Sequence, residues 1–327
     1  MQRKTVPRVA TKDAARDIVS GVALTGFVFA VSIYIPIAGF FSALFIPLPV
    51  IFYRVKLGRN AGSIVPGIAA VLMLLAIGRL SIDLWFFVEL LLMGFVMGEL
   101  FERRLSVEKT VLYTSAAAMG STVLALVFYS AVSHTAVTAL VSDYVSQNLQ
   151  LTLKLYRNMG VSQENIDLIA KSLDHIQYYL VRMLPSIMAV STLFAAWVNL
   201  LLARSLLRAK TQAAVDFGTL NHWQAPEHLV WGVIGCGTLL LVAGSAGRLI
   251  GLNGLLVLMT VYLFQGLAIV AFFFEKKHFP RMFRIFLYTL IAVQQMLLLI
   301  IIVVGLFDTW FNFRKIGPTA TDETDSI

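Results

Sequence analysis

The sequence contains one cysteine, few charged side chains and no recognisable catalytic motif, and each of these shortages excludes a class of protein. Cys236 alone cannot form a disulfide within the chain, and no group of Cys and His has metal-ligand spacing. There is no HExxH, GxSxG or Walker A lysine motif, and the five histidines are scattered. We therefore expect no metal site, no cofactor and no catalytic residues. We do not expect an enzyme, although an intramembrane enzyme is an alternative to the two classes of function given below.

Charged side chains make up 13% of the sequence and hydrophobic ones 58%, with a mean hydropathy of +0.81. Such a chain is too apolar for an ordinary soluble domain. Apolar runs of about 20 residues, the length that a transmembrane helix needs, recur along it. The sequence therefore predicts an all-α, polytopic bundle of transmembrane helices whose partner is the lipid bilayer.

The net charge of +8 does not indicate a nucleic-acid partner. Lys and Arg lie at the ends of apolar runs rather than in one basic stripe, so they are topology signals.

The apolar runs predict nine spans. Their expected ranges are 18–35, 37–53, 63–79, 82–101, 110–133, 178–203, 229–247, 252–274 and 285–307. The second range is short and contains Pro47 and Pro49, so the number falls to eight if this segment is re-entrant. With nine spans and a cytoplasmic N-terminus, 18 of the 26 Lys and Arg residues lie on the inner side, as the positive-inside rule requires. This count places the C-terminus outside.

Residues 134–177 form a long polar interruption between the fifth and sixth spans. Apolar residues recur there at helical spacing, Gly160 suits a C-terminal cap and Ser162 suits an N-cap. We predict an outer helical hairpin that feeds the sixth span, either as a packed spacer or as a lid or partner-docking element. The other expected segments are a basic cytoplasmic N-terminus (1–17), the first five spans (18–133), the sixth span (178–203), a basic inner loop (204–228), the last three spans (229–316) and a disordered acidic tail (317–327).

Glu89 is the sharpest candidate for a functional group. It lies in the apolar stretch FFVELLLMGFVMGELF, where an ionisable side chain is costly and often functional. It is either a substrate or proton site, or a structural group that is paired with an arginine or protonated. Glu99 has Arg103 at i+4, which predicts a simple ion pair. The spacing of Gly94 and Gly98 permits close approach of another helix.

Helix breaks and buried amides are further candidates for lining a substrate cavity. Proline frees a backbone carbonyl, and interrupted spans often mark binding sites in transporters. The alternative is an ordinary kink, and for the amides it is hydrogen bonding between helices. The residues concerned are Pro47, Pro49, Pro185, Asn199, Gln265, Gln294 and Gln295.

Asp308 ends the last span, where the helix dipole disfavours a negative charge. The nine-span topology places it at the level of Arg79, Arg182 and Arg248. We expect one of these arginines, or backbone donors at a neighbouring helix start, to hold the carboxylate. Phe307, Trp310, Phe311 and Phe313 are expected to form an interfacial belt. Trp310 and Arg314 are i, i+4 neighbours, a spacing that allows them to stack.

Several segments, in order, resemble the YybS family of bacterial polytopic membrane proteins of unknown function. They are YRNMGVSQENIDLIAKSLDHI, LPSIMAVSTLFAAWVNLLLAR, APEHLVWG, LNGLLVLMTVYLFQGLAIVAFFF and GLFDTWFNFRK. The resemblance implies a multi-pass protein of the bacterial cytoplasmic (inner) membrane. It also implies a distant similarity to the substrate-binding S components of energy-coupling-factor vitamin transporters, with residues 18–203 as the corresponding unit.

S components dock on a membrane partner through small-residue faces of their first helix, and Gly21 and Thr25 offer a weak version of that pattern. The outer hairpin and three added spans depart from the S-component plan. A fold-level analogy of this kind warrants a hypothesis only.

Two classes of function follow. The first is a transport or solute-binding component without its own ATPase, with a small-molecule solute bound near Glu89 and the broken spans. The second is a scaffold or regulator that holds a membrane or cytoplasmic partner protein through the outer hairpin or the basic inner loops.

Overall fold

The computed structural model describes residues 11–78, 81–210 and 220–315, and in these ranges every regular element is helical. The prediction of an all-α bundle is confirmed. Arg79, residues 1–10, much of the basic inner loop and the acidic tail lie outside the described residues. The chain divides into two compact units, one of residues 1–181 and 191–216 and one of residues 182–190 and 217–327.

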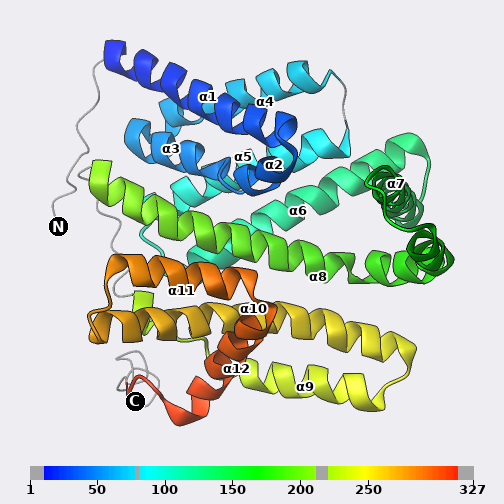
Figure 1. The fold of residues 1–327 in the computed structure, drawn as a ribbon. Coiled ribbons are helices and arrows are strands. Elements are labelled where there is room, and N and C mark those ends of the chain that lie inside the picture. The colour runs from blue at the N-terminus through cyan, green and yellow to red at the C-terminus, as the bar shows by residue number, and fades with distance from the viewer. Residues whose placement is uncertain (1–10, 79–80, 211–219, 316–327) are drawn as a thin grey trace. The chain divides into compact units, whose positions relative to one another are not determined.

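The first unit contains most of the helices drawn in blue to green in Figure 1. They are α1 (Thr11–Tyr34), α2 (Pro36–Ala43), α3 (Pro47–Gly62), α4 (Ile64–Ile77), α5 (Ile82–Glu102), α6 (Val107–Ser133), α7 (Val137–Asn158) and most of α8 (Gln163–Lys210). The second unit contains the 3-10 turn η1 (Leu220–His222), α9 (Leu229–Val242), α10 (Ser245–Lys276), α11 (Arg281–Val293) and α12 (Gln295–Phe311).

Six described helices are long and apolar enough to cross a membrane, or seven if the bent pair α11 and α12 counts as one span. The prediction of nine spans is therefore not confirmed. The expected third and seventh spans correspond to α4 and α9, which have 14 residues each. At 1.5 Å per residue such a helix is about 21 Å long, shorter than the hydrocarbon core of about 30 Å.

The expected second span is divided between two helices, α2 and α3. Pro47 and Pro49 do not interrupt a helix, because Pro47 begins α3, where the missing N–H of proline costs nothing. α3 then lies against α5. A Cβ on Gly94 would come within 2.7 Å of the Pro47 carbonyl, and one on Gly98 within 2.6 Å of the Arg54 side chain. The predicted close approach at this glycine pair is confirmed.

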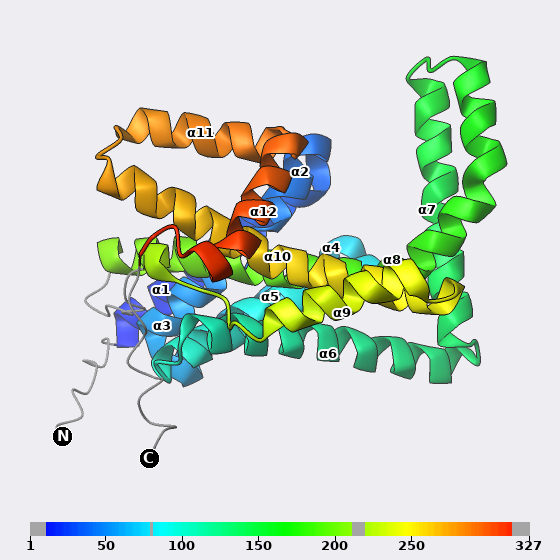
Figure 2. The same ribbon diagram turned by 90° about the horizontal axis from the view of Figure 1, so that it is seen from below.

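The polar interruption forms the predicted hairpin of α7 and the start of α8, which continues into the sixth span. Gly160 has a φ of +78°. Val161 N–H donates to Tyr156 O and Gly160 N–H to Arg157 O, which is the Schellman ending. Figure 2 shows α7 at a wide angle to α6. A hollow of about 480 Å³ lies at the tip, lined by Tyr156, Val161, Asn165, Leu168 and Ile169.

In the second unit, α10 contacts both α9 and α12 over most of their lengths. Glycine makes the second contact close, because a Cβ on Gly305 would lie 2.1 Å from the Tyr262 carbonyl oxygen, and one on Gly266 would lie 2.1 Å from that of Ile301. α11 and α12 are bent by 101° at Gln294. The predicted last span is thus a broken pair rather than one straight helix.

Candidate functional site

Glu89 lies on the side of α5 that contacts α6. Thr122 of α6 donates a hydrogen bond of 2.6 Å from Oγ1 to Glu89 Oε2. Both side chains are partly buried, and the described residues record no ion pair for this carboxylate. The alternative of a pair with an arginine is not what the structure has. A carboxylate held by one hydroxyl in an apolar bundle retains acceptor capacity for a proton or a ligand.

A dry apolar layer lies one helical turn away from Glu89. Met93, Ala118 and Ala195, from α5, α6 and α8, are 1%, 0% and 7% exposed and form one cluster with Leu44. Met93 follows Glu89 by four residues and Ala118 precedes Thr122 by four, so the layer covers one side of the Glu89–Thr122 pair.

Beyond this layer α6 carries further buried hydroxyls. Thr110, Thr114 and Ser115 are 0%, 0% and 3% exposed. Their oxygens have no hydrogen-bond partner among the described residues. A buried hydroxyl without a partner loses hydration without compensation, at a cost of about 1–3 kcal/mol. Three such groups on one helix are unusual, and each has unused hydrogen-bonding capacity.

Asn199 of α8 has a structural role in this region. Its Nδ2 donates to Leu44 O at 2.8 Å, the carbonyl that the break between α2 and α3 leaves free, and to Ala195 O at 2.9 Å. This is the hydrogen bonding between helices that we gave as the alternative. Asn199 Oδ1, which is buried, has no partner among the described residues. The Asn199 Nδ2 group therefore donates to the carbonyl at the helix break, while its Oδ1 has no donor among the described residues.

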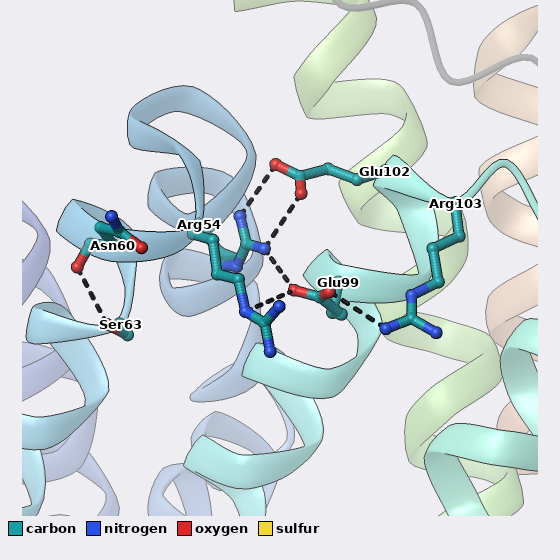
Figure 3. A network of polar contacts seen from close by, with 7 residues as sticks. Arg54, Asn60, Ser63, Glu99, Glu102 and Arg103 are labelled. Atoms are coloured by element: carbon teal, nitrogen blue, oxygen red, sulfur yellow. Dashed lines mark hydrogen bonds and ion pairs between the residues drawn. The ribbon is translucent and has the colours of Figure 1, made fainter.

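A second polar cluster lies where α3 meets the end of α5 (Figure 3). Arg54 is fully buried, and it donates to both carboxylate oxygens of Glu102 at 2.9 and 3.0 Å and also pairs with Glu99. Arg103 completes the group at 3.3 Å from Glu99. The predicted Glu99–Arg103 pair is confirmed, but the main partner of Glu99 is Arg54. Two carboxylates offset the buried guanidinium, so the cluster joins α3 to α5.

The second unit contains a fully buried ion pair. Arg314 donates to Asp308 Oδ2 at 2.8 Å, and neither side chain is exposed. Asn312, with a φ of 41°, ends α12 in the left-handed conformation that Asn tolerates. The chain therefore turns back, and Phe313 N–H reaches Asp308 Oδ1 at 2.9 Å. This donor set compensates the carboxylate at the negative end of the helix.

The same pair supports an irregular stretch of backbone. Arg314 also donates to the carbonyls of Asn221 and Trp223, at 2.8 and 2.9 Å. Gln265 donates to Asp308 Oδ2 at 3.1 Å and accepts from Ala225 N–H at 3.1 Å. Non-helical backbone at membrane depth needs protein partners, and these two side chains provide them.

Our prediction for the partner of Asp308 was wrong. Arg314 holds it, not Arg182 or Arg248, and Arg79 is outside the described residues. The nine-span topology caused the error, because Gln265 lies about 25 Å beyond Arg248 along α10 at ~1.5 Å per residue. Arg314 does not take up the stacking with Trp310 that its spacing allows, since Arg314 is buried against Asp308 while Trp310 is exposed beside Phe307.

The kink at Pro185 is closed by a residue that sequence reasoning missed. Asn253 of α10 accepts from Ser186 N–H at 3.2 Å and donates to Arg182 O at 3.1 Å. Its amide therefore bridges the two backbone groups that face each other across the broken turn. Pro185 is thus a supported kink and not the wall of a cavity.

The remaining cavity candidates do not come together. Gln294 and Gln295 are exposed at the bend between α11 and α12, and Gln265 supports Asp308. Gly21 and Thr25, the weak version of the S-component docking face, are buried as well. A Cβ on Gly21 would lie 2.8 Å from the Tyr53 ring, and Thr25 is fully buried. Their face of α1 packs inside the first unit.

The family model described as "Predicted membrane protein (DUF2232)" matches residues 23–309, nearly all of the span-bearing chain. The chain belongs to this family. The "Uncharacterized protein YybS" of Bacillus subtilis (strain 168) is 22% identical over 304 residues, which cover 90% of this chain and 95% of YybS. The resemblance to the YybS family is therefore confirmed. No solved structure matches the chain, and the similarity to S components stays a prediction.

Proposed function

We propose that the protein is a transport or solute-binding component of the membrane, and that Glu89, Thr122 and the hydroxyls of α6 form its binding path. The observation that carries the proposal is the unpartnered set Thr110, Thr114 and Ser115, buried along α6 between Thr122 and the start of that helix. Polar groups are expensive inside a span and are kept there for a function.

The chemistry of this path favours a cationic ligand. The oxygens that it offers are one carboxylate, four hydroxyls and the vacant Asn199 Oδ1. Oxygen donors of this kind suit a proton, a small monovalent cation or a protonated amine. Met93 and Ala118 separate the Glu89 end from the hydroxyl end, so passage requires this layer to open.

Thermal stability in detergent tests the proposal, because a ligand of the folded state stabilises it by about 2.7 kcal/mol at 100 times its Kd. Sodium, potassium, lithium and a set of primary amines are the probes. We expect at least one to raise the melting temperature of the wild type and to have no effect on Glu89→Gln or Thr122→Val. Asp143→Asn, an exposed carboxylate of the hairpin, is the matched control and should keep the shift. Retention of every shift in both folded variants refutes the proposal.

The orientation of the chain is also a proposal. We infer that the N-terminus is cytoplasmic and that the C-terminus lies on the same side as the basic turn after α10, rather than outside. The support is that Asp308 contacts Gln265 on the half of α10 that leads to Lys276, and that α11 and α12 are sharply bent.

Cysteine labelling tests this orientation. In a Cys236→Ala background, Ser326→Cys should react with a membrane-impermeant maleimide only after permeabilisation, whereas Ser172→Cys in the hairpin should react in intact cells. Reaction of Ser326→Cys in intact cells would refute this orientation and place the C-terminus outside.

A further inference from the structure

α7 has three distinct faces. Val145 and Leu153, each 8% exposed, form its buried face. Asp143, Gln150 and Arg157, each exposed and spaced by seven residues, form a polar face. The third face is the apolar stripe, which we define as Tyr144, Leu151, Leu155 and Met159.

The apolar stripe is exposed along its whole length. Its four side chains are 38%, 58%, 59% and 76% exposed, in chain order. Leu153 is two residues from Leu151 and from Leu155, which is about 160° around a helix of 3.6 residues per turn. The stripe therefore points away from Leu153, and at its base the Tyr144 hydroxyl donates to Asp83 Oδ1 at 3.4 Å, at the start of α5. An exposed apolar row of this length on a soluble helix marks an interaction surface.

The connection between α6 and α7 keeps the hairpin near the membrane. Only His134, Thr135 and Ala136 separate the end of the α6 span from α7. In the first unit α7 runs across the direction of α6 rather than continuing it, as Figures 1 and 2 both show. A helix that leaves a span through so short a connection at a wide angle must run along the membrane surface.

The order of the two arms decides which way the stripe faces. In both views α7 is the arm nearer the length of α6, and the start of α8 is the farther arm. Gln177 of α8 bonds to Ser142 of α7 and holds the two arms together. The stripe lies on the side of α7 opposite Leu153.

We propose that the outer hairpin is an interfacial arm, with the apolar stripe of α7 seated in the headgroup layer of the same membrane that α6 crosses. Helices that lie in the interface have this division into an apolar and a charged face. Tyr144 at the base of the stripe is an aromatic residue of the type that the interface favours. The arm would fix this end of α6 relative to the bilayer.

Site-specific fluorescence quenching tests the arm. Leu155→Cys and Gln150→Cys, each in Cys236→Ala, carry an environment-sensitive label on the stripe and on the polar face of the same helix. The protein is reconstituted at one copy per nanodisc in phosphatidylcholine with phosphatidylglycerol. We expect lipids with a doxyl group near the headgroup to quench the Leu155 label at least threefold more than the Gln150 label. Aqueous iodide should give the reverse order.

Two results overturn the proposal. Equal iodide quenching at the two positions means that the stripe is in water. Protection of the Leu155 label from iodide in crowded vesicles but not in single-copy nanodiscs means that a second copy of the chain covers it. Circular dichroism of the labelled variants confirms that each is folded before it is compared.

Discussion

Removing the charge of Asp308 is expected to destabilise the second unit strongly. Asp308 and Arg314 are 1% and 3% exposed. In Asp308→Asn the guanidinium stays buried without its counter-ion, and the new amide faces the donors of Gln265 and Arg314. Loss of one partner of a buried pair costs about 3–5 kcal/mol. For a chain of this size we expect the melting temperature to fall by roughly 10 °C.

The assay is loss of the monodisperse detergent peak on heating. Arg103→Gln is the matched control, because the Arg103–Glu99 pair has a similar length but an Arg103 side chain that is 62% exposed. Such exposed pairs contribute about 0–1 kcal/mol. The control should therefore melt within a few degrees of the wild type, since 1 kcal/mol corresponds to about 2–4 °C.

A double-mutant cycle separates the pair from its surroundings. Arg314→Gln should destabilise by a similar amount, and Asp308→Asn with Arg314→Gln by clearly less than the sum, because no unpaired charge remains buried. If Asp308→Asn has the same melting temperature as the Arg103→Gln control, the pair does not stabilise the unit and the reasoning is refuted.

Three further perturbations test other contacts. Gly305→Ala should lower the melting temperature by several degrees, because its Cβ would meet backbone at 2.1 Å, whereas Gly235→Ala, with nothing within 4 Å, should not; equal effects would contradict the close contact. Asn253→Ala should cost about 1–3 kcal/mol by leaving the kinked backbone of α8 without a partner, and an unchanged melting temperature would contradict this. Burial, followed by the charge of Asp83, raises the pKa of the Tyr144 hydroxyl. Its neutral form therefore stabilises the hairpin below the ordinary pKa of about 10, and this contribution is lost as the pH rises through the folded-state pKa. Melting from pH 8 to 11 should fall more steeply for the wild type than for Tyr144→Phe, and parallel curves would contradict the shift.

Hydropathy predicted the class of the protein and the approximate place of its long helices, because both depend on composition over many residues. It failed to distinguish a span from an apolar run that forms a shorter helix. α4 ends at Ile77, before Gly78 with a φ of +72°, and α9 ends at Val242, so each has only 14 residues. Arg248 was read as a loop residue, although α10 begins at Ser245.

The partner of Asp308 was missed for a local reason. We looked for an arginine at the same level on another helix, and the partner lies six residues later in the chain. The signal was present in the sequence, since Asn312 is a residue that favours the left-handed turn after a helix. Such a turn brings the following residues back over the last turn. Asn253, by contrast, gave no local signal, because its pairing with the Pro185 kink joins residues far apart in the chain.

Whether a buried polar group has a hydrogen-bond partner distinguishes structural from functional groups better than its position in a span does. In the second unit each oxygen of Asp308 and the carbonyl oxygen of Gln265 has a donor. Three donors therefore hold the Asp308 carboxylate, so we assign it to stability. In the first unit Thr110, Thr114 and Ser115 leave their hydroxyls unpartnered among the described residues. Single groups unpartnered within the described part of the chain also occur in the second unit, at Tyr262 and Arg314, so it is the three hydroxyls on one helix that favour a ligand in the first unit.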